Sequence, residues 1–381
     1  MANNDIYLDF AAATPISEAV MSAMRPYFSD NFYNPLAEYG PAREVRNAVD
    51  TARKSVASRL GCKPTEVVFT AGGSEANNLA INGIMKKNPQ SNLIITAIEH
   101  DSVTKAAEQF KHHVVGVDKT GILNLDNLRN KIVDDTVLVS VVYANNEIGT
   151  IQPVKKIAKL LQEIREMRAE KNNLTPLYFH IDASQASNYL DLHVHRLGVD
   201  MMTLNGGKMY GPKQSGALYV RGGLELEPII YGGGQERGLR SGTQNPATIV
   251  GFAVALDEAQ ELKDVEVDRL LTLRDGLIKN IQSISPKIFI NGSLRNRLPN
   301  NISITIPDYD NERLQIELDN RGIFVAVGSA CSASSSDPSR VMKAIGLSDA
   351  EARNTLRITL GRSNTKKQIE TVTKTLQSLV S

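Results

Sequence analysis

The sequence predicts an α/β protein in which a mostly parallel sheet is covered by helices, with a smaller α+β domain attached. From about residue 65, short β-branched segments alternate with amphipathic stretches, an order typical of a parallel sheet with helices on both faces. Beyond about residue 256 this alternation gives way to a polar amphipathic helix and a few short strands. The length of 381 residues suits two or three domains and a large core.

The elements of the larger part are predicted from the period of their apolar residues. The first strand, residues 66–70, leads through a Gly-rich turn into a helix over residues 75–85. A second helix covers residues 154–168, where apolar side chains recur at helical spacing. Further strands are predicted at residues 93–97, 113–117, 136–142, 177–181, 201–204 and 217–220.

The sequence of the C-terminal part predicts a different arrangement of strands and helices. Strands are expected at residues 301–306, 323–327 and 356–360, and helices near residues 312–320 and 366–380. We therefore expect a large α/β domain over residues 16–256 and a small α+β domain built from residues 1–15 and 257–381. The Ser-rich stretch at about residues 328–337 is typical of a mobile loop.

Composition excludes several classes of protein. Forty-three Lys and Arg against 42 Asp and Glu leave a net charge of +1, which gives no reason to expect a nucleic-acid or membrane-surface partner. The two cysteines, Cys62 and Cys331, form no CxxC pair, which excludes a disulfide scaffold and a zinc ribbon, and no metal site is predicted. No apolar run approaches the ~18 residues of a membrane span, and the N-terminus shows no signal peptide. We expect a cytoplasmic protein.

Polar residues that could bind a ligand or take part in catalysis follow several predicted strands, and ligands bind at these strand ends in α/β sheets. Gly73 lies in a Gly-rich turn and Ser74 opens the helix that follows, an arrangement that favours a phosphate group, although an ordinary turn with a serine cap has the same sequence. Asp182 and Gln185 follow another strand. This acid could bind a cation or a ring N–H group, or cap the next helix.

Three further side chains are candidates for catalysis. Lys208 lies in a Gly-rich loop after a strand and could bind a carbonyl compound covalently, although most lysines are only solvated. His100 alone among the six histidines shares a strand-end position. Cys331 lies among small polar residues, where a thiol is an accessible nucleophile or an incidental surface group. A phosphate cradle, an acid, a lysine and a histidine at one sheet edge together predict a pyridoxal phosphate pocket.

With these residues, the chain resembles the cysteine desulfurases of the NifS/IscS type, within the class V aminotransferase group of fold-type I pyridoxal phosphate enzymes. The resemblance runs nearly end to end, and the Gly-Ser-Ala-Cys block at residues 328–331 is its most specific part. The other matching blocks are residues 7–15, 69–75, 99–100, 145–149, 180–185, 208–213, 232–243 and 356–357.

The resemblance implies a role for each candidate. Lys208 would carry the cofactor covalently, and the phosphate would be bound by Gly73, Ser74 and Thr243 of the partner subunit in a homodimer. His100 would stack on the ring and help to move protons. Asp182 would bind the pyridine nitrogen, and Gln185 would bind the ring hydroxyl. Asn146 would bind cofactor and substrate, and Arg357 would bind the substrate carboxylate, a task that suits its guanidinium.

The activity implied is the conversion of L-cysteine to L-alanine. Lys208 would remove the Cα proton, and Cys331 would take the sulfur as a persulfide and pass it to an acceptor protein. That acceptor would serve iron–sulfur cluster assembly or tRNA thiolation. A selenocysteine lyase, a small-molecule aminotransferase and a non-catalytic pyridoxal-fold binding subunit are the alternatives.

Two positions depart from the family pattern. Asn205 and Gly207 stand where relatives usually have serine and histidine, both of which help to hold the phosphate. Asn205 can still donate through its amide, whereas Gly207 offers only its backbone. The sequence therefore predicts a weaker or rearranged grip on the cofactor.

Overall fold

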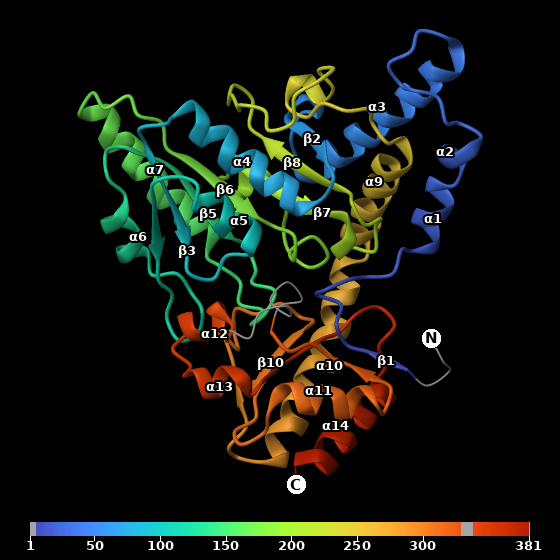
Figure 1. Cartoon of the computed structure of the whole chain (residues 1–381), viewed down its shortest axis with the longest axis vertical. Coiled ribbons are helices and arrows are strands. Elements are labelled where there is room, and N and C mark those ends of the chain that lie inside the picture. Colours follow the sequence, from blue (N-terminus) through green and yellow to red (C-terminus); the bar gives the residue numbers. More distant parts are fainter. Residues whose placement is uncertain (1–4, 329–337, 381) are drawn as a thin grey trace.

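A seven-stranded sheet forms the larger part of the molecule, and two small sheets form the part below it (Figure 1). The computed structural model describes residues 5–328 and 338–380. The strand order of the large sheet is β2-β8-β7-β6-β5-β3-β4. Its strands are β2 (Val67–Thr70), β3 (Asn92–Thr96), β4 (His112–Val115), β5 (Thr136–Val142), β6 (Tyr178–Asp182), β7 (Met201–Asn205) and β8 (Gly216–Val220).

The prediction of a mostly parallel sheet is confirmed. Neighbouring strands from β7 through β6, β5 and β3 to β4 are parallel. Within this described sheet, β8 runs antiparallel to both of its neighbours, β2 and β7. The carboxyl ends of β2, β3, β5, β6 and β7 therefore meet at one edge of the sheet.

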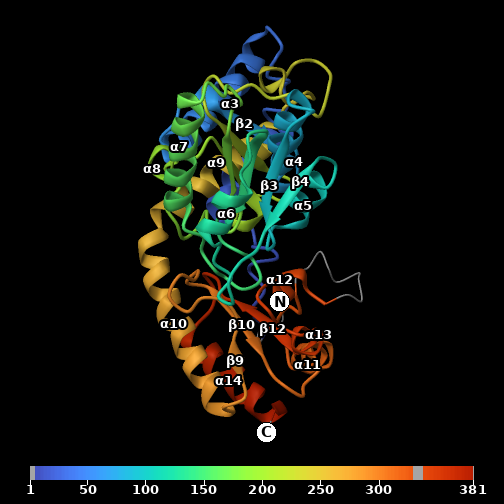
Figure 2. The ribbon, with the colours of Figure 1, turned by 90° about the vertical axis from the view of Figure 1, so that its left-hand side faces the viewer.

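Helices cover both faces of the large sheet. Successive side chains of a strand point to opposite faces, so Val67 and Phe69 pack with α1, α3, α7 and α9, whereas Val68 packs with α4 and α5. Figure 2 shows these two layers on either side of the strands. The helices of this part are α1 (Glu18–Met24), α2 (Pro26–Ser29), α3 (Gly40–Leu60), α4 (Gly73–Lys87), α5 (Asp101–Ala107), α6 (Leu125–Lys131), α7 (Val154–Glu170), α8 (Val194–Leu197) and α9 (Pro246–Glu261).

Helix α9 was not predicted as an element of its own, and the structure gives the reason. Apolar and small side chains lie all around it and are buried, among them Ile249, Phe252 and Leu256. A helix buried on most sides lacks the polar stripe that marks an amphipathic helix. The predicted domain limit at residue 256 falls inside this helix and stays a prediction.

The small part has its own core, formed around Leu277, Leu356 and Leu376. It contains an antiparallel sheet in the order β12-β10-β9 and a parallel pair of β1 with β11. The strands are β1 (Ile6–Tyr7), β9 (Phe289–Ile290), β10 (Asn301–Thr305), β11 (Ile323–Phe324) and β12 (Thr355–Thr359), and the helices are α10 (Lys263–Ile284), α11 (Asn311–Asp319), α12 (Arg340–Ala344), α13 (Asp349–Arg353) and α14 (Lys366–Val380).

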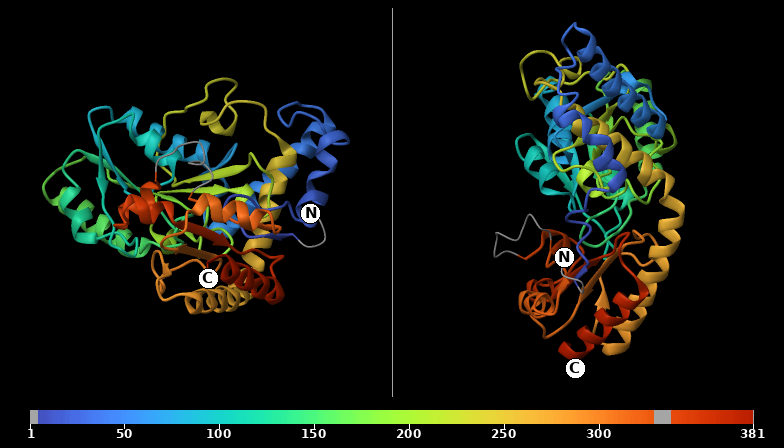
Figure 3. Two further views of the ribbon diagram at one scale, coloured as in Figure 1. Left: turned by 60° about the horizontal axis from the view of Figure 1, so that its bottom comes forward. Right: turned by 90° about the vertical axis from the view of Figure 1, so that its right-hand side faces the viewer.

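The first and last elements of the described chain, β1 and α14, both belong to the small part (Figure 3, blue and red). After β1 the chain runs along the junction to α1 and touches both parts on the way. The Phe10 N–H group donates to the Thr359 carbonyl over 3.4 Å, and the Thr14 N–H group donates to the Gly207 carbonyl over 3.3 Å. No helix in the described ranges is long and apolar enough to cross a membrane.

Candidate functional site

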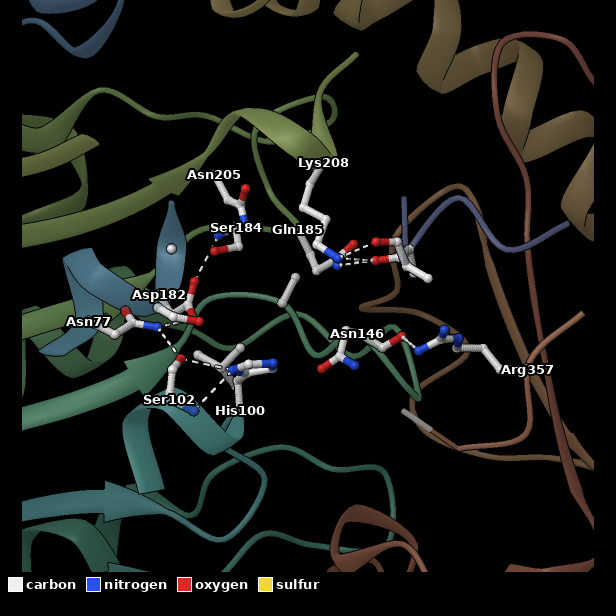
Figure 4. Close-up of a pocket in the computed structure, with 16 residues that line it drawn as sticks. Asn77, His100, Ser102, Asn146, Asp182, Ser184, Gln185, Asn205, Lys208 and Arg357 are labelled. Atoms are coloured by element: carbon white, nitrogen blue, oxygen red, sulfur yellow. Dashed lines mark hydrogen bonds between the residues drawn. The ribbon is translucent and has the colours of Figure 1, made fainter. Parts of the chain in front are cut away.

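A pocket of about 600 Å³, partly open to solvent, lies at the carboxyl edge of the large sheet and faces the small part. Figure 4 shows its polar side chains converging from α4, α5, β6 and β7 on one side and from β12 on the other. The predicted site residues that line it are Gly73, Ser74, His100, Asn146, Asp182, Gln185, Asn205, Lys208 and Arg357.

One end of the pocket is formed by the start of α4. Gly72 precedes the helix with φ +124°, a backbone conformation that favours glycine. A Cβ atom on Gly73 would lie 2.9 Å from the Ser184 hydroxyl and 3.2 Å from the Asn205 amide nitrogen, so only glycine fits there without a shift. Ser74 is the second residue of the helix rather than its cap. Helix N–H groups and polar side chains thus meet here, as an anion site requires.

Asp182 ends β6 and is buried. Its Oδ2 accepts a hydrogen bond of 2.8 Å from the Asn77 amide, and its Oδ1 accepts one of 2.9 Å from the Ser184 N–H group. It does not cap a helix, because the residues that follow form turns. Both bonds aim the carboxylate into the pocket (Figure 4).

The lysine amine lies near the N-terminal segment. Lys208 Nζ donates to the carbonyls of Ala11 and Ala12 over 2.9 and 2.6 Å. Gln185 Nε2 donates to the same Ala11 carbonyl over 3.0 Å. Residues 11 and 12 therefore belong to the pocket, which sequence reasoning missed, although they lie in the matching block at residues 7–15.

Arg357 extends from β12 into the pocket and is 2% exposed. Its Nη2 donates to Asp9 Oδ1 over 2.6 Å and its Nη1 donates to the Asn146 carbonyl over 3.3 Å. Its buried Nε finds no hydrogen-bond partner in the described part of the chain. A buried guanidinium N–H group without a partner is costly, and an anionic ligand would satisfy it.

Among the described residues, one predicted site residue does not line the pocket, and another predicted site residue lies outside the described ranges. Thr243 is exposed, at the end of a segment that the buried Glu236 holds through a hydrogen bond and ion pair of 2.7 Å with Arg53. Cys331 lies outside the described residues, as does the stretch at residues 329–337.

Burial shifts the pKa values of three groups around the pocket. It raises the pKa of Glu99, next to His100, to about 8, and it also raises the pKa of Glu147. Burial lowers the pKa of His180 to about 4. His180 lies between the hydroxyl groups of Ser140 and Thr203, at 2.8 and 3.0 Å, so both of its ring nitrogens have a hydrogen-bond partner in the core.

Comparison with known proteins gives the family. The model of the family described as aminotransferase class-V matches residues 6–372. The chain belongs to the class V aminotransferases. A cysteine desulfurase IscS from Clostridium botulinum is 39% identical, over 99% of this chain and 95% of the relative.

Solved structures agree with this assignment. A NifS-like protein shares the fold with a TM-score of 0.90 and 30% identity, covering 99% of both chains. SspA, solved in complex with cysteine, has a TM-score of 0.80 and 36% identity over 93% of this chain and 98% of its own. The prediction of a NifS/IscS-type class V aminotransferase with the fold-type I architecture is confirmed.

Class V enzymes of this kind use pyridoxal phosphate, and the pocket fits this cofactor. The glycine-lined start of α4 leaves room for a phosphate beside Gly73 and supplies donors to it. Asp182 offers a carboxylate for the ring nitrogen, and Lys208 offers an amine for the aldehyde. The unpartnered Nε of Arg357 suits the carboxylate of an amino-acid substrate.

Sequence reasoning also missed Asn77, Ser102 and Ser184, which line the pocket. Asn77 lies four residues after Gly73 on α4, and residues four apart share a helix face. This spacing was the signal that could have found it. Ser102 and Ser184 each lie two residues after a predicted site residue.

Proposed function

We propose that this chain is a pyridoxal phosphate-dependent cysteine desulfurase. It converts L-cysteine to L-alanine and transfers the sulfur to Cys331 as a persulfide. The observation that carries the proposal is the convergence of Lys208, Asp182 and Arg357 on one pocket, in a chain similar over nearly its whole length to cysteine desulfurases.

When bound, the cofactor supplies an electron sink that stabilises negative charge at the substrate Cα. Asp182 would hold the ring nitrogen in its charged form, and its carboxylate is oriented for this by Asn77 and the Ser184 N–H group. The Gly73 and Ser74 end of the pocket holds the phosphate. Gln185, whose amide donates to the Ala11 carbonyl, would bind the ring hydroxyl.

The substrate is oriented by Arg357, which binds its carboxylate beside Asn146. Asp9 fixes one edge of the guanidinium, so the other edge keeps a defined direction. Lys208 then removes the proton from the substrate Cα. Its amine is oriented by the backbone carbonyls of Ala11 and Ala12.

Both described flanks of the segment that contains Cys331 lie at the pocket. Ala326 pairs with Arg357 through two backbone hydrogen bonds of 2.7 and 3.1 Å. On the other flank, Ser339 donates to Glu147 over 2.6 Å, and Arg340 forms an ion pair with Asp101, the neighbour of His100. These contacts support delivery of the Cys331 thiol to the substrate sulfur.

The test is the Cys331→Ser variant, assayed with L-cysteine for sulfide and alanine. We expect sulfide release to fall to the background without enzyme, while the visible absorption of the bound cofactor stays unchanged. Borohydride reduction and peptide mapping should place the cofactor on Lys208. Full turnover by Cys331→Ser, or no adduct at Lys208 with the cofactor in excess, would overturn the proposal.

Cys62→Ser is the matched control. Cys62 lies two residues after the end of α3, outside the pocket, and burial raises the pKa of its thiol to about 12, so it is a poor nucleophile. This variant should keep wild-type sulfide release. An aminotransferase would instead be insensitive to both substitutions.

We further propose that the enzyme acts as a homodimer. Large apolar side chains are exposed on the chain around α2 and near residue 231, with exposures of 61% for Phe28, 67% for Phe32 and 68% for Tyr231. Both segments lie at the end of the molecule away from the small sheets (Figure 1). Thr243 is exposed on the second segment, which suits donation to the phosphate in the partner subunit. Light scattering should give twice the chain mass of 41.6 kDa.

The sulfur acceptor is proposed to be a protein of iron–sulfur cluster assembly or of tRNA thiolation, in the cytoplasm. A persulfide on Cys331 that is transferred to the acceptor's cysteine in a pulse-chase with labelled L-cysteine would identify it.

A further inference from the structure

A chain of side-chain hydrogen bonds joins Asp182 to His100. The Asn77 amide nitrogen, on α4, lies 2.8 Å from Asp182 Oδ2 and 2.9 Å from the Ser102 hydroxyl. The Ser102 hydroxyl in turn lies 2.8 Å from His100 Nδ1. Figure 4 shows the four side chains in sequence along one wall of the pocket.

The direction of each hydrogen bond follows from the groups involved. An amide nitrogen can only donate, so both N–H groups of Asn77 are used, one on Asp182 and one on Ser102. The Ser102 hydroxyl accepts from Asn77, and its own hydrogen is available for His100 Nδ1. The backbone N–H group of Ser102 also donates to Nδ1, over 3.1 Å.

These bonds define the proton position on the imidazole. Nδ1 of His100 accepts from two donors, the hydroxyl and the N–H group of Ser102. An accepting ring nitrogen carries no hydrogen, so the neutral ring carries its proton on Nε2.

The orientation of Asn77 supports the same assignment. Its Oδ1 is buried and has no hydrogen-bond partner in the described chain. Rotating the amide by 180° would place this oxygen against the Asp182 carboxylate, where two acceptors would repel each other. The fold therefore keeps an unsatisfied carbonyl oxygen in order to aim both N–H groups at Asp182 and Ser102.

We infer that Asn77 and Ser102 are positioning residues that hold His100 as its Nε2–H tautomer and link its orientation to the Asp182 carboxylate. The inference rests on the proposed function for its consequence. One amide connects the group that would hold the cofactor's ring nitrogen with the imidazole that would stack on the ring, so both act on the ring from fixed positions.

The direct test is ¹⁵N NMR of the cofactor-loaded protein labelled on histidine, with the His100 signals assigned from a His100→Gln variant. We expect Nε2 in the range of a protonated ring nitrogen and Nδ1 in the range of an accepting one. Ser102→Ala removes one of the two donors and should move the Nδ1 signal toward that of a nitrogen with fewer hydrogen bonds. Ser102→Thr keeps the hydroxyl and should leave the signal in place.

Kinetics provide a second measurement. With the cofactor at saturation, Ser102→Ala and Asn77→Ala should each lower kcat about fivefold, the size of one hydrogen bond, with KM for L-cysteine changed less than twofold. Ser102→Thr should restore kcat. Asn82→Ala is the matched control, because Asn82 lies on α4 and its side chain bonds only to Asn78 among the described residues.

Several results would overturn the inference. A proton on Nδ1 of His100 in the wild type, or an Nδ1 signal unaffected by Ser102→Ala, would refute the hydrogen-bond chain. Equal kcat losses in Ser102→Ala and Ser102→Thr would refute a positioning role for the hydroxyl. The NMR readout does not depend on sulfide release, so failure of the proposed function can be recognised separately.

Discussion

The buried carboxyl of Glu99 should make the stability of the protein depend on pH. Glu99 Oε1 accepts hydrogen bonds from the Thr96 hydroxyl at 2.6 Å and the Val142 N–H group at 2.8 Å, whereas its Oε2 is buried without a partner among the described residues. Burial raises its pKa from 4.5 to about 8. Between these two values the folded protein holds a proton that the unfolded chain has lost, so stability falls as the pH rises.

The size of this effect follows from the pKa shift. One pKa unit corresponds to about 1.4 kcal/mol, so the interval from 4.5 to about 8 gives up to ~5 kcal/mol. Unfolding entropy is about 2.1 cal/mol/K per residue, which for 381 residues converts this energy into a shift of about 6 °C in Tm. Glu99→Gln keeps an acceptor for both donors and does not titrate, so it should avoid the loss.

The assay is the Tm of the wild type and of Glu99→Gln at pH 5 and pH 8.5. We expect the difference, variant minus wild type, to increase by several degrees between the two pH values. Glu170→Gln, at an exposed position near the end of α7, is the control and should show no such increase. Parallel pH dependence in Glu99→Gln and the wild type would refute the assignment of a neutral buried carboxyl.

Three other substitutions test the pocket. Arg357→Lys removes the planar fork and should raise KM for L-cysteine roughly thirtyfold, the equivalent of ~2 kcal/mol for hydrogen bonds to a charged group; an unchanged KM would contradict its role. Gly207→His should lower the cofactor Kd by roughly tenfold through a restored phosphate contact. The nearest atoms to a Cβ atom there are Asn205 Oδ1 at 3.5 Å and Lys213 at 3.8 Å, so the side chain has room. An equal Kd in a cofactor titration would show that the phosphate is already fully bound without the histidine. Asp182→Asn should reduce kcat by about a hundredfold with the cofactor still bound, and wild-type kcat would exclude a charged partner for the ring nitrogen.

Much of the fold could be predicted because its signals are local. The strand at residues 136–142 was predicted with the limits of β5, and the strand at residues 177–181 lies within one residue of β6. Predicted limits were least accurate where a single residue sets them. Helix α4 begins at Gly73 rather than near residue 75, because the backbone of Gly72 turns there.

The pocket was predictable where its residues follow strands of the parallel sheet, as Asp182 and Lys208 do. Contacts from other parts of the chain were not. Asp9 comes from the N-terminal segment and pairs with Arg357, 348 residues away, and no local pattern signals such a pair. Ala11 and Ala12 contribute only their backbone carbonyls to Lys208, and a backbone acceptor gives no signal in the sequence.

The N-terminal segment has a structural role that these contacts make clear. Between β1 and α1 it places Asp9 against the substrate-side arginine and the carbonyls of residues 11 and 12 against the lysine amine. The Thr14 side chain then donates to the Gly207 carbonyl over 3.1 Å, and its oxygen accepts from the Tyr210 N–H group over 2.8 Å. One short segment is thus bonded to both walls of the pocket. The same short segment thus provides the hydrogen-bond partners of both Arg357 and Lys208, although these two side chains come from different parts of the molecule.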